Sequence, residues 1–445
     1  MKVQITETAP IRPSPLPFSD DHTLALSHLD NDHSLNVTFR YLRAYVNNNN
    51  NTTDRNPFQV ISSAVSAALH HYYPLGGSLC RASNGRYELV CKVDQTLPLV
   101  HASADCTLES VNYLDDPDMN SVEQLVPDPN PEETMVNPCI LQVTMFKCGG
   151  FTLGAAIHNS LCDGLGATQF FCMAADLARG IDQIKFQPVW DRAALLGPRN
   201  PPRVEGPIKE FVSLEKGFHP YKQNLGHVVR ECFYVEDECL DQLKALLLEQ
   251  SGLNLTTFEI LGAYIWRAKV KAAKIPGDET VKYAYLMNIR RIVKPPLPAG
   301  YWGNGCVAMY AKLSAKELIE QPLWKTAELI KKSKSNAGDE YVRSFIDLQE
   351  LHYEEGISGG KGVSGFTDWR HLGHSAVDFG WGGPVTVLPL SSNFLGSMEP
   401  CFFLPYSSFD TGKNKGFKVL VSLRESAMPA FREEMEKFTR KEFGL

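Results

Sequence analysis

The spacing of apolar residues changes along the chain between a period of two, typical of strands, and a period near 3.6, typical of helices. In the first half, residues 139–147 and 151–157 are rich in apolar residues and are separated by a Cys-Gly-Gly turn, which predicts a β-hairpin. Residues 165–180 follow with helical spacing and end at a glycine, so we expect a helix directly after the hairpin. The other elements predicted in this half are a strand at 35–46, a helix within 58–80 that stops at Tyr73-Pro74, and a strand at 86–93.

Residues 185–225 interrupt this pattern, because they contain many prolines and show little periodicity. This composition predicts a crossover loop between an N-terminal domain at 1–184 and a C-terminal domain at 226–445. The second domain is predicted to mix strands and helices in the same way as the first. Its predicted helices are 238–250, 255–273, 315–336 and 427–442, and its predicted strands are 227–235, 281–290, 401–405 and 416–423.

Composition and charge exclude several classes of function. The 445 residues are enough for about two domains, and the net charge of -7 gives no general attraction to nucleic acid or to an anionic membrane surface. The N-terminus has no apolar signal region, and no apolar run is long enough to predict a membrane-spanning helix. The eleven cysteines are scattered without metal-ligand spacing, so we expect free thiols, no metal site and a cytoplasmic protein.

One stretch carries candidate chemistry: "IHNSLCDG" at 157–164, between the predicted hairpin and the predicted helix. A histidine at the end of a strand can be held rigidly beside a cleft, where it could take a proton from an alcohol or amine that attacks a carbonyl. The aspartate could orient the loop. A single histidine near an aspartate is weak evidence, however, and by itself this spacing favours an ordinary surface loop.

Several segments together change that interpretation, because they resemble the plant BAHD acyl-CoA-dependent acyltransferases. The segments are "CDGLGATQF" after "CGGFTLG", "YYPLGGSL" (72–79), "FEILGAYIWRAK" (258–269), "NIRRIVKPPLPAGYWGN" (288–304) and "DFGWG" beginning at Asp378. The resemblance extends from about residue 3 to the C-terminus, and the order and separation of the two main motifs are highly specific. The "CDGLGA" segment is most similar to the taxane-type and polyamine-acylating members.

The resemblance implies an α/β fold of two similar chloramphenicol-acetyltransferase-like domains, with a solvent channel between them. It implies a monomer without a permanently bound cofactor or a metal, which uses acyl-CoA as a co-substrate. In the family, a histidine deprotonates a small-molecule alcohol or amine, which attacks the thioester directly. The oxyanion that forms needs a hydrogen-bond donor.

The register of the family motif, His-x-x-x-Asp-Gly, assigns the base position to Asn159. Counting back from Asp163 places Asn159 where the family has its histidine, and His158 lies one residue too early. A shift of one residue along a strand turns a side chain to the opposite face, so we expect His158 to point away from the channel and to be the less suitable base. An asparagine amide cannot act as a general base near neutral pH, and the loss of such a base typically costs about 10²–10⁴-fold in rate.

The resemblance also implies roles for residues outside this stretch. Asp163 would form a structural ion pair with Arg290, which is otherwise a weak candidate for binding CoA. Asp378 would be structural and tied to an arginine, and Trp381 would contribute to the oxyanion site or the pocket wall. The loop of Trp302, Gly303 and Asn304 would approach the channel, and Thr256 and Thr257 would contact the CoA arm or cap a helix. His371 and His374 are assigned no role.

Three explanations for Asn159 remain open. The favoured one is a deliberate replacement of histidine that keeps the shape of the site and blocks turnover; the others are a natural divergent member and a loop rearrangement that brings His158 into the base position. The predicted function is O-acyl transfer from acyl-CoA to a hydroxyl of a plant specialised metabolite, impaired by Asn159. The alternatives are a lyase acting by intramolecular elimination, an N-acyltransferase acting on an amine or polyamine, and a binding protein without catalytic activity.

Overall fold

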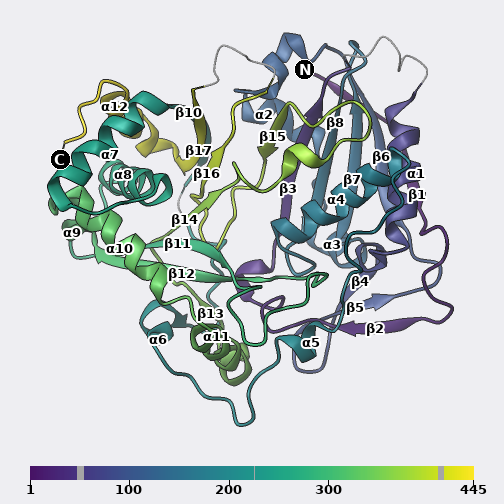
Figure 1. Cartoon of the computed structure of the whole chain (residues 1–445), viewed down its shortest axis with the longest axis horizontal. Helices are drawn as coiled ribbons and strands as arrows, with labels where there is room; N and C mark the ends of the chain where they lie inside the picture. The colour runs from purple at the N-terminus through teal and green to yellow at the C-terminus, as the bar shows by residue number, and fades with distance from the viewer. Residues whose placement is uncertain (48–54, 225, 409–414, 445) are drawn as a thin grey trace.

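The structure, a computed structural model, describes residues 1–47, 55–224, 226–408 and 415–444. Two six-stranded sheets lie side by side and form the centres of the two domains (Figure 1). The first sheet has the order β1 (Val3–Ile11), β6 (Leu97–Ala104), β7 (Cys139–Met145), β8 (Phe151–His158), β3 (Thr38–Tyr45) and β15 (Thr386–Pro389). The second has the order β10 (Val228–Glu236), β17 (Gly416–Arg424), β16 (Cys401–Leu404), β14 (Val363–Asp368), β11 (Thr280–Asn288) and β12 (Cys306–Ser314). The predicted α/β fold of two mixed domains is confirmed.

In the first domain, α1 (Pro57–Leu69) and α4 (Gly164–Ala178) pack against each other. The helix predicted within 58–80 was expected to stop at Tyr73-Pro74, and it ends slightly earlier, at Leu69. Pro74 lacks a backbone N–H and disfavours helical geometry at the residue before it, so the helix does not continue. A short 3-10 turn follows, and the chain then enters a small sheet of β2 (His22–Ala25), β5 (Tyr87–Cys91) and β4 (Ser78–Arg81). Two further short helices in this domain are α2 (Met119–Val122) and α3 (Pro131–Val136).

In the second domain, α8 (Thr257–Ala272) is the central helix, and nearly all of its side chains are buried. It is surrounded by α7 (Asp237–Ser251), α9 (Ala315–Glu320), α10 (Leu323–Ser335) and α12 (Met428–Thr439). The single helix predicted at 315–336 is two helices, because Pro322 interrupts it. The sequence analysis did not predict α11 (Asp339–His352), which follows them.

The two halves of the chain are interlocked. Residues 185–224 cross between the domains and carry the short helices α5 (Arg192–Leu195) and α6 (Ile208–Phe211) (Figure 1). In the same segment, β9 (Ser213–Leu214) pairs with β13 (Ile357–Ser358). Strand β15 comes from the second half of the sequence but joins the first sheet, where Val387 pairs with Arg43 of β3. The segment before it is also part of the first core, through Val377 and Phe379. The range 226–445 therefore supplies part of both domains.

Two negative findings apply to the described residues. None of their helices combines the length and the apolar character needed to cross a bilayer. They also contain no group of three or more histidine, cysteine, aspartate or glutamate side chains placed to hold a metal ion.

Candidate active site

The end of β8 determines which of two neighbouring residues faces the space between the domains. His158 is the last residue of the strand and pairs with Thr38 of β3. The pairing continues for one more residue, because the Asn159 N–H donates to the Val37 carbonyl at 3.0 Å. Side chains alternate between the two faces of a strand. Asn159 therefore lies on the face of Ile157 and Phe39, and His158 lies on the opposite face.

Asn159 lines a cavity of about 500 Å³ between the two domains, called here the Asn159 cavity. Its wall combines residues of both domains, among them Phe39, Tyr41, Ile157, Asn159, Asp163, Phe258, Tyr285, Phe366, Trp369 and His374. Most of these side chains are apolar or aromatic. The amide of Asn159 has no side-chain hydrogen bond within the described parts of the chain, so it is available to a ligand.

His158 lines a different cavity, of about 900 Å³, called here the His158 cavity. The wall of this cavity carries several charged side chains: Arg40, Arg81, Glu123 and Arg230. His158 is only 3% exposed, and its Nδ1 accepts a hydrogen bond from the Ser160 N–H at 3.2 Å. Burial, with a smaller contribution from the charge of Arg81, lowers the pKa of His158 to about 4. The structure thus gives no support to a rearranged loop with His158 in the base position.

Asp163 is held in a buried ion pair with Arg290. The two guanidinium nitrogens of Arg290 donate to the carboxylate at 2.7 and 3.1 Å, and the N–H groups of Gly166 and Gly305 donate at 2.8 and 3.0 Å. Burial favours a raised pKa for Asp163, but Arg290 and the two N–H donors outweigh it, so the pKa is lowered. Asp163 therefore stays ionised and fixes the start of α4. The ion pair occupies Arg290, which leaves it unsuited to bind CoA phosphates.

The loop after β11 supports Asn159 through one side chain. The Asn304 Nδ2 donates to the Asn159 carbonyl at 2.8 Å and to the Asp30 Oδ1 at 2.9 Å. Trp302 is fully buried, and its indole N–H donates to the Gly166 carbonyl at 2.8 Å. Gly303 packs closely on Arg192, so that an added Cβ would lie 3.0 Å from the Arg192 Cδ. Of the three loop residues predicted to approach the channel, only Asn304 lines the cavity.

The two predicted residues of the "DFGWG" segment lie away from the Asn159 cavity. Asp378 accepts hydrogen bonds from the N–H groups of Gly380 and Gly382 at 2.7 and 2.8 Å and lies 3.6 Å from the Arg179 guanidinium, so it shapes its own turn. The expectation that Trp381 forms the oxyanion site or the pocket wall is wrong. Trp381 packs edge-on against Phe151, with ring centroids 5.3 Å apart, at the opposite end of β8 from His158.

The threonines predicted to contact CoA are at the start of α8. The Thr256 Oγ1 accepts from the Glu259 N–H at 3.4 Å, and the Glu259 carboxylate accepts from the Thr256 N–H at 2.7 Å. This reciprocal capping box uses the polar atoms of Thr256 within the helix. Neither Thr256 nor Thr257 lines the Asn159 cavity, whereas the next residue, Phe258, does.

Trp369 and His374 are among the residues in the wall of the Asn159 cavity to which the sequence assigned no role. They lie shortly before the "DFGWG" segment, and no local pattern in the sequence distinguishes them from ordinary buried residues. Burial lowers the pKa of His374 to about 3, with Arg43 acting in the same direction. His374 is therefore neutral at physiological pH.

Every ionisable group in the described wall of the Asn159 cavity is already engaged or neutral. Burial raises the pKa of the Cys162 and Cys306 thiols well above their usual value. The remaining charged groups are paired, namely Asp163 with Arg290, Asp368 with Arg370 and Lys334 with Glu259. The neutral His374 is engaged as well, because its Nδ1 lies 3.2 Å from the Arg43 Nη2 and accepts from it. The described wall therefore offers hydrogen bonds and aromatic contacts, but no free general base.

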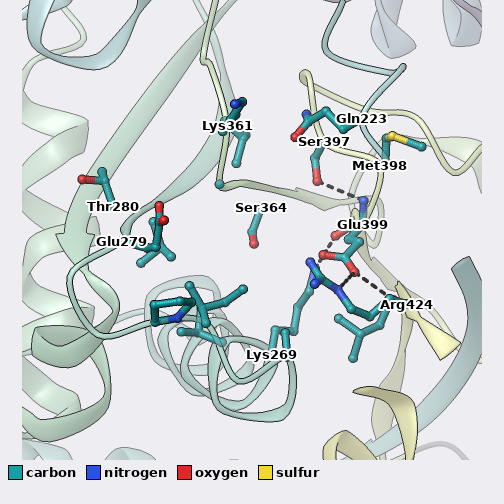
Figure 2. A pocket seen from close by; sticks show the side chains of 18 residues that line it. Gln223, Lys269, Glu279, Thr280, Lys361, Ser364, Ser397, Met398, Glu399 and Arg424 are labelled. Atoms are coloured by element: carbon teal, nitrogen blue, oxygen red, sulfur yellow. Dashed lines mark hydrogen bonds and ion pairs between the residues drawn. The ribbon is translucent and has the colours of Figure 1, made fainter. Parts of the chain in front are cut away.

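A further cavity, of about 310 Å³, lies at the other end of α8 (Figure 2). Figure 2 shows Lys269 of α8 beside Glu399 and Arg424, and the Glu399 carboxylate lies 3.3 Å from the Arg424 Nε. None of the residues predicted for the active site lines this cavity. The Asn159 cavity is thus the site where the predicted chemistry and the geometry coincide.

Comparison with known proteins places this site in a family. A model described as the Transferase family matches residues 1–438. Spermidine sinapoyl-CoA acyltransferase of Arabidopsis thaliana is 33% identical over 427 residues, which cover 93% of each chain. The chain belongs to the BAHD family of acyl-CoA-dependent acyltransferases. Another BAHD relative, 3'-N-debenzoyl-2'-deoxytaxol N-benzoyltransferase of Taxus canadensis, is 31% identical over 446 residues, or 97% of this chain and 95% of the relative.

Solved structures share the BAHD fold at lower sequence identity. Vinorine synthase superimposes with a TM-score of 0.73 at 21% identity and covers 98% of both chains. TRI101 of F. graminearum, in complex with coenzyme A and deoxynivalenol, superimposes with a TM-score of 0.77 at 14% identity, covering 94% of this chain and 98% of that one. Acyl-CoA is the co-substrate of the family.

Proposed function

We propose that this BAHD protein transfers an acyl group from a CoA thioester to an amino group of a small metabolite in the Asn159 cavity. One observation carries the proposal: the cavity lined by Asn159, the residue that the motif register assigns to the family base, has no free base in its described wall. The nitrogen attacks the thioester carbonyl carbon, the C–N bond forms, and the C–S bond breaks. CoA leaves as a thiolate and takes up the proton released by the nitrogen.

An amine fits this site better than an alcohol for a chemical reason. A neutral amine has a free lone pair and attacks before it loses a proton, whereas an alcohol needs a base during the attack. Asn159 cannot supply that base. Two relatives support an amine acceptor by name, the spermidine sinapoyl-CoA acyltransferase and the N-benzoyltransferase described above.

An alcohol acceptor, as the sequence analysis predicted, is the second candidate. Taxadien-5-alpha-ol O-acetyltransferase of Taxus chinensis is 30% identical over 449 residues, which favours ester formation. With an alcohol, the missing base would lower the rate by about 10²–10⁴-fold relative to a histidine-containing site. This candidate therefore predicts a slow enzyme that a histidine at position 159 would activate.

A matched pair of acceptors separates the two candidates. We would assay the unmodified chain and Asn159→His with benzoyl-CoA and 4-coumaroyl-CoA, using benzylamine and benzyl alcohol as acceptors. Amide formation by the unmodified chain is expected to rise about tenfold per pH unit below the pKa of the amine, because only the neutral amine attacks. Asn159→His is expected to raise ester formation by about 10²–10⁴-fold and amide formation by less than tenfold.

Other results would overturn the amine proposal. Ester formation without amide formation, followed by large activation in Asn159→His, would establish the alcohol acceptor and support a replaced histidine. The absence of both products in both variants would exclude acyl transfer to these acceptors. Conversion of a conjugate by elimination, without any CoA ester, would establish the lyase alternative.

A further inference from the structure

The hydrogen bond between Arg43 and His374 fixes the proton on His374. The Arg43 Nη2 lies 3.2 Å from the His374 Nδ1. A guanidinium group can only donate, so Nδ1 must be the acceptor and the proton of the neutral ring must be on Nε2. Protonation of Nδ1 would place a second positive charge against Arg43 in a buried position. His374 is therefore held as a neutral ring whose Nε2 is a hydrogen-bond donor.

The Nε2 donor has no partner within the described residues. It is buried and makes no hydrogen bond there, and the whole His374 side chain is only 8% exposed. An N–H group that is removed from water without an acceptor costs about 1–3 kcal/mol, so the site favours a ligand atom that accepts this bond. His374 lines the Asn159 cavity, so that cavity is the side from which a ligand atom would approach the ring.

Arg43 makes the surroundings of this donor electropositive. Arg43 is fully buried, and its guanidinium lies over the rings of Phe171 and Tyr41, 4.4 and 5.0 Å from their centroids. Its Nε and Nη1 make no hydrogen bond within the described residues. The aromatic faces compensate part of its charge. An electron-rich oxygen next to His374 would compensate more of it, which an apolar group could not do.

An aromatic wall connects the region of Asn159 to His374. Phe39 pairs with Ile157, two residues before Asn159 on the same face of the sheet. Ring contacts then lead from Phe39 to Trp369 and from Trp369 to His374, with centroid separations of 5.7 and 5.3 Å. Tyr41 contacts both Trp369 and Phe39, with centroid separations of 5.8 and 6.3 Å. A flat ring would find stacking and edge contacts along this wall.

We propose that Phe39, Tyr41, Trp369 and His374 form a subsite for an aromatic ring of the substrate that carries an oxygen acceptor, such as a phenolic oxygen. The ring lies along the wall, and its oxygen accepts a hydrogen bond from the His374 Nε2. The proposal rests on the proposed function in one respect: the ring belongs to a substrate of acyl transfer, as part of either the acyl donor or the acceptor.

Two substrate pairs, each differing by one phenolic oxygen, test the subsite and identify its occupant. The acyl pair is 4-coumaroyl-CoA, which carries a 4-hydroxyl group on its ring, and cinnamoyl-CoA, which does not. The acceptor pair is tyramine and phenethylamine. The unmodified chain is expected to prefer the oxygen-bearing member of one pair. His374→Phe is expected to remove that preference, a change of about 2- to 12-fold in the ratio of kcat/KM, because a net hydrogen bond contributes about 0.5–1.5 kcal/mol. The pair that responds identifies whether the subsite takes the acyl donor or the acceptor.

His374→Gln is the matched control. The glutamine amide can accept from Arg43 through its oxygen and donate to the ligand through its nitrogen, so the preference should return at least in part. His374→Phe also leaves an N–H of Arg43 without its acceptor and is expected to be less stable. The ratio between two substrates within one variant cancels any loss of folded protein. An equal effect of His374→Phe on both members of each pair, or no preference in either pair, would overturn the subsite.

Binding measurements keep the subsite separate from the proposed function. Calorimetric Kd values for the same four compounds require no turnover. If no transfer occurs but the affinity ratio depends on His374, the subsite stands and acyl transfer to these acceptors fails. If transfer occurs and both the kinetic and the affinity ratios are independent of His374, acyl transfer stands and the subsite fails.

Discussion

The two cavities at the end of β8 differ in almost every property although neighbouring residues line them. The Asn159 cavity lies between the domains and is walled mainly by aromatic and apolar side chains, whereas the His158 cavity is larger and charged. The difference arises from the alternation of one strand, which sends consecutive side chains to opposite faces. His158 is therefore next to Asn159 in sequence but does not line the Asn159 cavity.

A buried histidine lines each cavity, and the two rings are held in the same tautomer. The Nδ1 of His158 accepts from a backbone N–H, and the Nδ1 of His374 accepts from Arg43. Each ring therefore carries its proton on Nε2, and burial lowers both pKa values, to about 4 and about 3. A histidine becomes a base only when an acceptor orients it and leaves a lone pair free. Here donors orient both rings and turn them into hydrogen-bond donors.

The largest expected effect concerns the ion pair between Asp163 and Arg290, next to the Asn159 cavity. Arg290→Met would leave the buried Asp163 carboxylate unpaired, so we expect the free energy of unfolding to fall by about 3–5 kcal/mol in chemical denaturation. Arg291→Met is the matched control, because Arg291 is adjacent and exposed, and it should change stability by less than about 0.5 kcal/mol. Equal effects of the two substitutions would show that Asp163 does not depend on Arg290.

The pH dependence of the free energy of unfolding tests whether His158 is buried in its neutral form. Burial lowers the pKa of His158 from its usual 6.5 to about 4, so the unfolded chain binds a proton more readily than the folded chain. Stability is therefore complete above about pH 6.5 and decreases as the pH falls towards 4, by on the order of 3 kcal/mol from this residue. His374 contributes with the same sign over a range that extends lower, to about pH 3.

Urea unfolding at pH 7 and pH 4 would measure this dependence. His158→Gln should reduce it, with the His374 contribution still present, whereas His227→Gln, at an exposed position, should leave it unchanged. A dependence that is the same in all three proteins would mean that His158 is not buried in its neutral form.

A smaller effect is expected at the hydrogen bond that supports the Asn159 loop. Asn304→Ala removes the bonds from its Nδ2 to the Asn159 carbonyl and to Asp30, so unfolding should become easier by about 1–3 kcal/mol. Acyl transfer in the Asn159 cavity should fall with it, because the loop loses its support. Unchanged transfer kinetics in a folded Asn304→Ala protein would show that Asn159 is positioned by the strand alone.

The smallest expected effect comes from a substitution of His158. It is the most direct test of the difference between the two faces of β8. His158→Gln removes the imidazole but keeps hydrogen-bonding groups on the far side of the strand. We expect kcat/KM for acyl transfer to stay within about twofold, since a loss of general-base catalysis would be about 10²–10⁴-fold. Steady-state kinetics at pH 7.5 would check this. A large loss would place His158 in the reaction, against the register of β8.

Local patterns predicted the part of the site that depends on neighbours in sequence. The hairpin ending in β8, the start of α4 at Asp163 and the opposite orientations of His158 and Asn159 all follow from periodicity and turn residues. The pairing of Asp163 with Arg290 came from the family resemblance rather than from any pattern, and the ion pair is present in the structure.

The failures concern contacts between distant segments. Trp381 and Trp369 are both buried tryptophans, and nothing in the sequence near them indicates which of the two lines the cavity. For the same reason, the sequence did not predict a role for His374, because its tautomer depends on Arg43, in a strand far away in the sequence. Periodicity reports which face of an element is buried, but not what lies against that face.

The late position of β15 has a consequence for how the chain is made. β3 emerges early from the ribosome, but β15, its neighbour on the outer side of the first sheet, is completed only at Pro389. At typical rates of protein synthesis, the edge of β3 stays unpaired for on the order of tens of seconds before β15 is synthesised. An unpaired strand edge readily recruits strands of other chains. The nascent N-terminal half should therefore be the aggregation-prone stage in the life of this protein, and fragments ending before residue 386 should reveal it by sedimenting as aggregates.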